Sequence, residues 1–185
     1  MEVAEFDDSN EFLSSQAPDL GVFTGGGMIS SETLEMFTLG VLNVHMGILP
    51  QYKGMDVVQA AVLENENAGL CAHLMSPALD AGPIINSLSL SPLGYPSLEY
   101  LRNTMSAFSP ILAFDSLLGL FSGRLECTDQ LPLGRQYYVM HPALMDLTND
   151  VLKNQLEKQS KPNDKLSKIF RDVVAVVNAA ESLKR

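Results

Sequence analysis

The sequence has little cysteine and little positive charge. Only two cysteines, Cys71 and Cys127, occur among its 185 residues, and they lie far apart and outside any C-x-x-C spacing. We therefore expect neither a disulfide framework nor a zinc site, and we expect both thiols to be buried as small apolar side chains. Such cysteine usage fits a protein of the reducing cytoplasm.

Basic residues are outnumbered by acidic ones, 12 to 22, which gives a formal net charge of −10. A surface of this sign repels phosphate backbones, so nucleic acid is not an expected partner. No apolar run reaches the length of a membrane span, because the stretch 107–121 is broken by Asp115 and by serine and glycine residues. The acidic N-terminus is the opposite of a signal peptide, and no membrane partner is expected.

Short apolar runs alternate with helix-like segments in the first half of the chain. We expect strands at 19–24, 41–44, 69–75 and 84–90, and helices at 32–38 and 57–63. This alternation predicts an α/β fold with an open, mostly parallel sheet. A doubly wound sheet normally carries more strands before such a point, so the sheet is expected to be short on its N-terminal side.

The hydrophobic pattern beyond Pro96 changes from short strand-like runs to helix-length periodicity. A helix is expected at 97–123, broken or kinked near Pro110, and further amphipathic helices at 147–159 and 165–183. The pattern divides the chain into three parts, which are an acidic N-terminal segment at 1–17, an α/β domain at 18–145 and a C-terminal helical tail at 146–185.

Polar side chains gather where three of the expected strands meet their loops. Asn43 and His45 follow the second strand, His73 lies late in the third, and Asp80 stands in the loop after it. In an open parallel sheet, ligands bind beyond the carboxyl ends of the strands. An asparagine amide can donate to a developing oxyanion, a histidine can act as acid or base, and an aspartate can fix the histidine tautomer. The set suits acyl-type transfer, although strand-end capping and a satisfied structural histidine fit the Asn-x-His pattern equally well.

Two longer stretches carry a family resemblance. The runs VLNVHMGILPQYKG and GLCAHLMSPALDAGPII resemble the catalytic domain of the formyltransferase family, whose members act on glycinamide ribonucleotide, methionyl-tRNA and amino sugars. The family pattern is an Asn-x-His followed by a Leu-Leu-Pro-x-(Tyr/Phe)-(Arg/Lys)-Gly loop, and later a Thr-Gly-x-Thr-x-His and an Asp-x-Gly. The sequence matches it at Asn43, His45, Leu49-Pro50, Tyr52-Lys53-Gly54, Gly69, His73 and Asp80-Ala81-Gly82. The resemblance covers about residues 18–90 and implies a Rossmann-like fold.

The resemblance also implies an activity, which is formyl transfer from 10-formyltetrahydrofolate to an amine. Asn43 would hold the formyl oxygen, a protonated His45 would stabilise the intermediate, and Asp80 would pair with His45 and help to deprotonate the amine. The folate would lie in an apolar pocket, for which the candidates are Met28, Ile29, Leu42, Ile48, His73 and Leu79. Each apolar candidate could equally be packed in the core.

The sequence departs from the family at several positions. Met46 and Gly47 stand where proline and serine are usual, and Ala68 and Cys71 replace small polar residues of the Thr-Gly-x-Thr motif. The family's first strands, whose glycine-rich loop binds the acceptor, are expected to lie upstream of this chain.

These departures leave several readings of the function open. The leading one is a cytoplasmic formyltransferase using a small-molecule amine. The alternatives are a formyltetrahydrofolate hydrolase, or a non-catalytic folate-binding or partner-dependent module. In the last case a homodimer or another partner would cover the open sheet edge.

The stretch QLPLGRQYYVMHP, residues 130–142, has no clear counterpart in that pattern. Its Arg135, Tyr137, Tyr138 and His141 form a polar and aromatic cluster that could close over the site. A surface strand with a capping role is the alternative.

Overall fold

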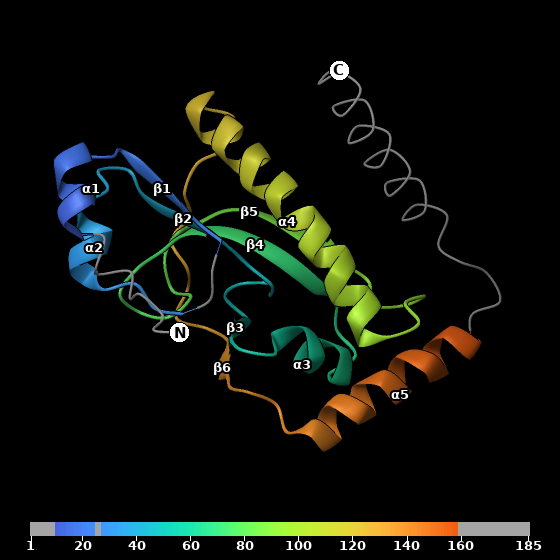
Figure 1. The fold of residues 1–185 in the computed structure, drawn as a ribbon. Coiled ribbons are helices and arrows are strands. Elements are labelled where there is room, and N and C mark those ends of the chain that lie inside the picture. Colours follow the sequence, from blue (N-terminus) through green and yellow to red (C-terminus); the bar gives the residue numbers. More distant parts are fainter. Residues whose placement is uncertain (1–9, 25–26, 159–185) are drawn as a thin grey trace, which may run out of the picture.

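The computed structural model describes residues 10–24 and 27–158, and it confirms the α/β fold (Figure 1). The elements follow the chain in the order α1 (Asn10–Gln16), β1 (Leu20–Phe23), α2 (Ser31–Glu35), β2 (Gly40–His45), β3 (Tyr52–Gly54), α3 (Val57–Leu63), β4 (Ala68–Leu74), β5 (Ile84–Leu90), α4 (Leu98–Phe121), β6 (Arg135–Tyr137) and α5 (Pro142–Lys158). All four predicted strands are present, as are the helices predicted at 32–38 and 57–63.

The main sheet has the strand order β1-β2-β4-β5. β1 and β2 run parallel, as predicted, whereas the β2–β4 and β4–β5 pairs are antiparallel. The prediction of parallel strands is therefore wrong for these two pairs. The short loop between β4 and β5 explains the second pair, because parallel neighbours need a long crossover and antiparallel ones do not. Among the described residues, β1 forms one edge of the sheet.

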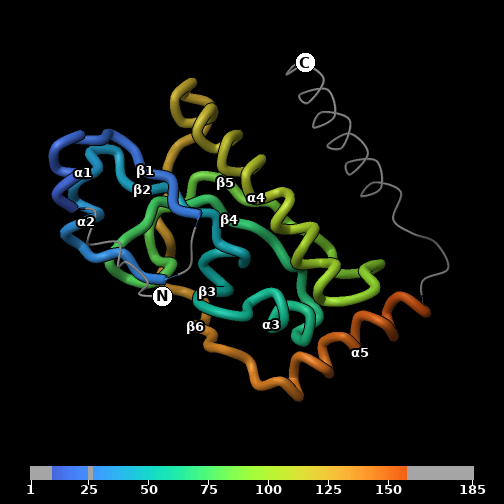
Figure 2. The backbone as a smooth tube through the Cα atoms, in the orientation of Figure 1, coloured from blue at the N-terminus to red at the C-terminus, as the bar shows by residue number. Residues whose placement is uncertain are grey.

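A second, two-stranded sheet pairs β3 with β6 in parallel. The tube drawing shows that the chain returns after α4 to place β6 beside β3 (Figure 2). The sequence did not predict β3, and it left β6 as one of two alternatives. A surface strand is confirmed at Arg135–Tyr137.

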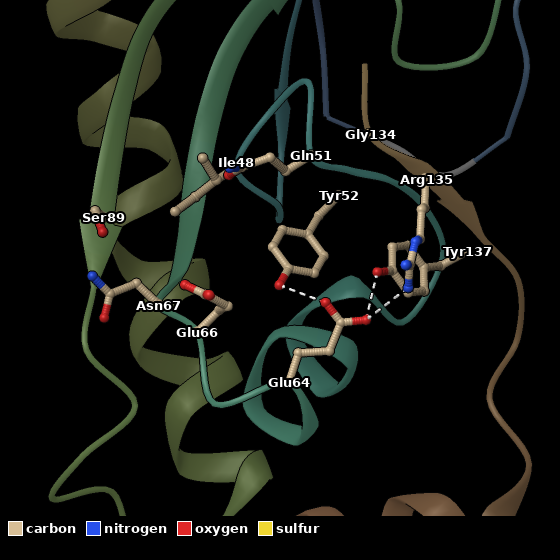
Figure 3. Close-up of a pocket in the computed structure, with 10 residues that line it drawn as sticks. All are labelled: Ile48, Gln51, Tyr52, Glu64, Glu66, Asn67, Ser89, Gly134, Arg135 and Tyr137. Carbon is tan, nitrogen blue, oxygen red and sulfur yellow. Dashed lines mark hydrogen bonds and ion pairs between the residues drawn. The ribbon is translucent and has the colours of Figure 1, made fainter.

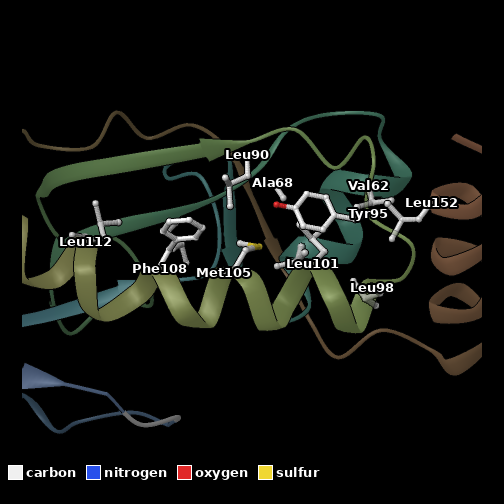
Figure 4. Close-up of a cluster of buried hydrophobic side chains, with 13 residues drawn as sticks. Val62, Ala68, Leu90, Tyr95, Leu98, Leu101, Met105, Phe108, Leu112 and Leu152 are labelled. Carbon is white, nitrogen blue, oxygen red and sulfur yellow. The ribbon is translucent and has the colours of Figure 1, made fainter. Parts of the chain in front are cut away.

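The long helix α4 lies across one face of the main sheet and supplies more residues of the core cluster than any other element (Figure 4). Its side chains Leu101, Met105, Phe108 and Leu112 recur every three or four residues and are buried. This spacing places them on one helix face. They pack with residues of α3, β4, β5 and α5, including Val62, Leu70, Leu90 and Leu152.

The predicted break near Pro110 does not occur, since α4 continues through this residue as one helix. By length and composition alone α4 is apolar enough to cross a membrane. In the fold, one face of α4 packs against the sheet, but only 28% of the apolar window is buried. The opposite side of the helix exposes Ile111, Phe114, Leu118 and Phe121. The absence of membrane association remains a prediction.

Three further predictions concern the two ends of the chain. A short helix, α1, lies within the predicted acidic N-terminal segment at 1–17, for which no helix was expected. α5 begins at Pro142, five residues before the predicted helix start at Leu147. The helix predicted at 165–183 lies outside the described residues.

Cys71 is buried as predicted, but Cys127 is exposed because it lies in the loop after α4.

Candidate active site

Strand pairing brings three of the predicted site residues together. Asn43 and His45 lie on β2, and the antiparallel register places Asn43 directly opposite His73 on β4. Side chains alternate between the two faces of a strand, so residues 43 and 45 point to the same side. The rings of His45 and His73 meet edge to face, with centroids 6.4 Å apart.

The hydrogen bonds of His45 fix its tautomer. Its Nε2 lies 2.8 Å from the carbonyl oxygen of Tyr52. A carbonyl can only accept, so Nε2 carries the hydrogen and donates it. The second nitrogen, Nδ1, lies 3.5 Å from Oδ2 of Asp80. In the neutral ring Nδ1 therefore carries no hydrogen, and it faces the carboxylate.

His73 is held in the same way but with its nitrogens exchanged. Its Nδ1 donates to the carbonyl oxygen of Leu74 at 3.0 Å, which leaves Nε2 to accept from the Asn43 amide at 3.3 Å. Burial lowers the pKa of His73 because it penalises the charged ring, and the nearby His45 lowers it further, whereas the bond to Leu74 and the charge of Asp80 oppose the shift. This neutral imidazole orients the asparagine and leaves its second N–H free to donate.

Asp80 contacts both histidines of the site and the backbone of β3. Its carboxylate accepts a hydrogen bond from the Gly54 backbone N–H at 2.8 Å and lies 3.8 Å from Nε2 of His73, in addition to its contact with His45. The residue has φ +48°, in the left-handed region, where aspartate is better tolerated than most residues. Its side chain is only 10% exposed.

The side chains of Asn43, His45 and Asp80 line a cavity of about 400 Å³. The cavity walls are mostly apolar and come from the end of β1, the 27–29 loop, the start of the loop after β3 and the 75–80 turn. The lining residues are Phe23, Gly27, Met28, Ile29, Asn43, His45, Gly54, Met55, His73, Met75, Ser76, Pro77, Leu79 and Asp80. An apolar cavity with a few convergent polar groups is the usual form of a small-molecule site.

Four of the six predicted folate-pocket residues line this cavity, namely Met28, Ile29, His73 and Leu79. Leu42 is fully buried in the core and does not line it. Ile48 lines a different cavity, of about 440 Å³. The sequence missed Phe23, Met55 and Met75 as lining residues, although Met55 directly follows the recognised Tyr52-Lys53-Gly54 loop.

The second cavity is organised around Glu64 (Figure 3). Its carboxylate accepts hydrogen bonds from the Tyr52 hydroxyl at 3.0 Å and the Tyr137 hydroxyl at 2.9 Å, and it lies 3.7 Å from the Arg135 guanidinium. Burial and the bonds to Glu64 raise the pKa of both tyrosines. The two tyrosine rings stack at 5.5 Å.

The cluster around Glu64 therefore ties β6 to β3 and α3, and it does not close over Asn43 and His45. Tyr138 and His141, the other two residues of the predicted cluster, line neither of these cavities.

No group of three His, Cys, Asp or Glu side chains positioned to hold a metal ion was found within residues 10–24 and 27–158. The side chains of the described site are an amide donor, two imidazoles and one carboxylate. An amide beside an imidazole can stabilise an oxyanion, and the carboxylate can accept a proton.

Known proteins similar in sequence to this chain are formyltransferases. The family model described as Formyl transferase matches residues 4–108. The methionyl-tRNA formyltransferase of Thermotoga maritima is 32% identical over 123 residues, which are 65% of this chain and 39% of the relative. The chain thus spans about two fifths of the length of this curated relative.

Solved structures share the fold at low identity. The formyltransferase PseJ from Anoxybacillus kamchatkensis, crystallised with a formamido sugar nucleotide and tetrahydrofolate, superimposes with a TM-score of 0.61 at 19% identity, covering 75% of this chain and 74% of PseJ. Phosphoribosylglycinamide formyltransferase from Bacillus halodurans gives a TM-score of 0.57 at 23% identity, covering 64% of this chain and 62% of that one.

Proposed function

This chain belongs to the formyl transferase family, and we propose that it transfers the formyl group of 10-formyltetrahydrofolate to an amine. The observation that carries the proposal is the convergence of Asn43, His45 and Asp80 at the mouth of one apolar cavity. The donor is a substrate of the proposed reaction, and the apolar walls of the cavity suit the flat faces of its pterin ring.

Asn43 is the candidate oxyanion donor. One of its amide N–H groups is held by Nε2 of His73, and the other is available to the formyl oxygen. Because the His73 ring is itself anchored on the carbonyl of Leu74, the amide is oriented before the substrate arrives. Preorganised donors of this kind contribute about 10²–10³ in rate when directed at developing negative charge.

His45 and Asp80 act on protons. In the protonated form, the positive charge of the His45 ring lies beside the cavity, where it stabilises the negative charge that develops on the formyl oxygen. The Asp80 carboxylate faces Nδ1 of His45 at 3.5 Å, within reach of an ion pair with the charged ring. As the amine attacks, Asp80 accepts its proton, directly or through a water molecule.

The proposed reaction balances without another reagent. The amine nitrogen forms a bond to the formyl carbon, and the bond from that carbon to N10 of the folate then breaks. The proton lost by the amine ends on N10, so the products are a formamide and tetrahydrofolate.

We further propose that the acceptor is a small-molecule amine in the cytoplasm. The net charge of −10 disfavours a tRNA acceptor for this chain, because phosphate backbones are held chiefly by lysine and arginine. Among its relatives, PseJ was crystallised with a formamido sugar nucleotide, which is a product of amine formylation.

Release of tetrahydrofolate from 10-formyltetrahydrofolate, followed with a panel of amines, tests this proposal. We expect amine-dependent release by the wild-type chain and a loss of about 10²–10⁴ in rate for Asp80→Asn, the range for a lost acid or base. The matched control is Asp115→Asn, whose carboxylate pairs with exposed Arg124 outside the site. Formate release without any amine would indicate a hydrolase instead. Equal rates for both variants would contradict the assignment of Asp80.

A further inference from the structure

Gln130 contacts the candidate site from a distant loop. It lies between α4 and β6, and its side-chain Nε2 is 2.9 Å from the carbonyl oxygen of Asp80 and 2.7 Å from that of Gly82. Because both carbonyls can only accept, the NH₂ group must face them and donates one N–H to each. The orientation of this amide is therefore determined by its partners.

The turn that Gln130 holds is one that needs support. Asp80 has a left-handed backbone with φ +48°, and Gly82 packs so closely on Leu74 that a Cβ at this position would overlap the Leu74 carbonyl oxygen. The Asp80 side chain must reach Gly54, His45 and His73 at the same time. A small displacement of this backbone would lengthen all three contacts.

The loop that carries Gln130 is itself anchored beside the turn. Thr128 exchanges two backbone hydrogen bonds with Ile84, at 2.8 and 2.7 Å, where β5 begins. This bridge fixes the position of the loop two residues before Gln130. The Oε1 atom of Gln130 is buried and has no hydrogen-bond partner among the described residues. A buried amide oxygen without a partner is costly, so the side chain keeps this position for the two bonds of its nitrogen.

We propose that Gln130 is a positioning residue of the site. Its amide clamps the carbonyls of Asp80 and Gly82, and this clamp keeps the Asp80 carboxylate within reach of His45 and His73. Gln130 acts on the carboxylate through the backbone and touches none of the reacting atoms.

The test compares Gln130→Met, which keeps the length but loses the donor, with Gln130→Glu, which places an acceptor against two carbonyls. Gln155→Met is the matched control, because Gln155 also donates one Nε2 bond, to Asn65, and also has a buried Oε1 without a partner in the described part of the chain. The readout is the set of ring ¹⁵N resonances. The chain has three histidines, and exposed His141 is an internal reference.

We expect both Gln130 variants to shift the ring resonances of His45 and His73 while His141 stays unchanged, and Gln155→Met to shift none of them. In the kinetic arm, which rests on the proposed function, kcat should fall by about 10- to 100-fold with the KM for the donor within about threefold, because misplacing a reacting group costs rate more than affinity. If the wild-type chain transfers no formyl group, the proposed function fails, but the resonances still decide the role of Gln130.

Two results would overturn the inference. One is folded Gln130 variants whose His45 and His73 resonances match those of the wild type. The other is loss of the fold in both Gln130 variants while Gln155→Met remains folded, because Gln130 would then support the fold as a whole.

Discussion

Nδ1 of His45 lies 3.5 Å from Oδ2 of Asp80, although one residue ends β2 and the other stands in the turn between β4 and β5. The contact exists because Nε2 of the same ring is occupied by the Tyr52 carbonyl, which leaves Nδ1 to face the carboxylate. Side-chain identity alone would allow either nitrogen to face Asp80. The backbone carbonyl at the start of β3 therefore selects the tautomer on which the proposed proton chemistry depends.

Replacing His45 separates catalysis from binding. We expect His45→Ala to lower the rate of formyl transfer by about 10²–10⁴, and to leave the Kd for the donor within about tenfold, because acid–base groups act mainly in the transition state. Single-turnover kinetics and donor titration measure the two quantities. His141→Ala is the control at an exposed histidine outside the site. An unfolded His45→Ala variant would show that this ring supports the fold rather than the reaction.

The α4 core makes a quantitative prediction about stability. Leu101 is fully buried against the sheet, so Leu101→Ala should lower the free energy of unfolding by about 2–5 kcal/mol. Leu118, on the same helix, is 51% exposed, and Leu118→Ala should change the free energy of unfolding by about 0.5 kcal/mol or less. Urea denaturation of both variants measures the difference, and comparable losses would contradict the burial of α4 on the sheet.

Gly82 tests the packing of the turn that carries Asp80. A Cβ at this position would overlap the carbonyl oxygen of Leu74, so we expect Gly82→Ala to displace the turn and to cost about 1–3 kcal/mol of stability. The ring resonances of His45 and His73 should move with it. Gly123→Ala is the contrast, because the left-handed φ of +69° would strain an alanine but nothing lies within 4 Å of the added Cβ. That variant should lose stability, by about 1–2 kcal/mol, without moving either ring resonance.

The buried His73 makes stability depend on pH. Its pKa is lowered in the folded chain, mainly by burial, so the unfolded chain binds the proton more readily. The contribution of neutral His73 to the free energy of unfolding is intact above the unfolded pKa of about 6.5. It is lost as the pH falls through the lowered pKa of the folded chain. We expect the wild-type chain and His141→Gln to lose stability together between about pH 6.5 and 5, and His73→Gln to lose less. Urea titrations across this range measure the slopes, and three parallel curves would refute a neutral His73.

Much of the fold and of the site could be predicted from local pattern. Apolar runs bounded by glycine and proline located the four strands of the main sheet, and three- and four-residue spacing located α4. The direction of β4 could not be predicted, because it depends on how the chain crosses back after α3. The short strands β3 and β6 carry too few residues for a period-two signal, and tertiary pairing alone defines them.

Within the site, alternation on a strand could have corrected one assignment. Asn43 and His45 share a face of β2, so Leu42 must point to the other face, and the structure places it in the core. Gln130 was beyond sequence reasoning for another reason. Its role depends on the loop after α4 returning to the 80–82 turn, and no local pattern reports such a return.

The most direct test of the account is isothermal titration of the chain with a stable analogue of 10-formyltetrahydrofolate, alongside Asn43→Ala and Asn67→Ala. Asn43 lines the cavity at the candidate site, and Asn67 lines the second cavity around Glu64, so the pair also distinguishes binding in one of these two cavities from binding in the other. We expect a Kd on the order of micromolar for the wild type. The value should weaken by about three- to tenfold in Asn43→Ala, the size of one hydrogen bond, and stay unchanged in Asn67→Ala. A folded chain that binds no analogue, or one weakened by Asn67→Ala alone, would contradict the proposed donor site.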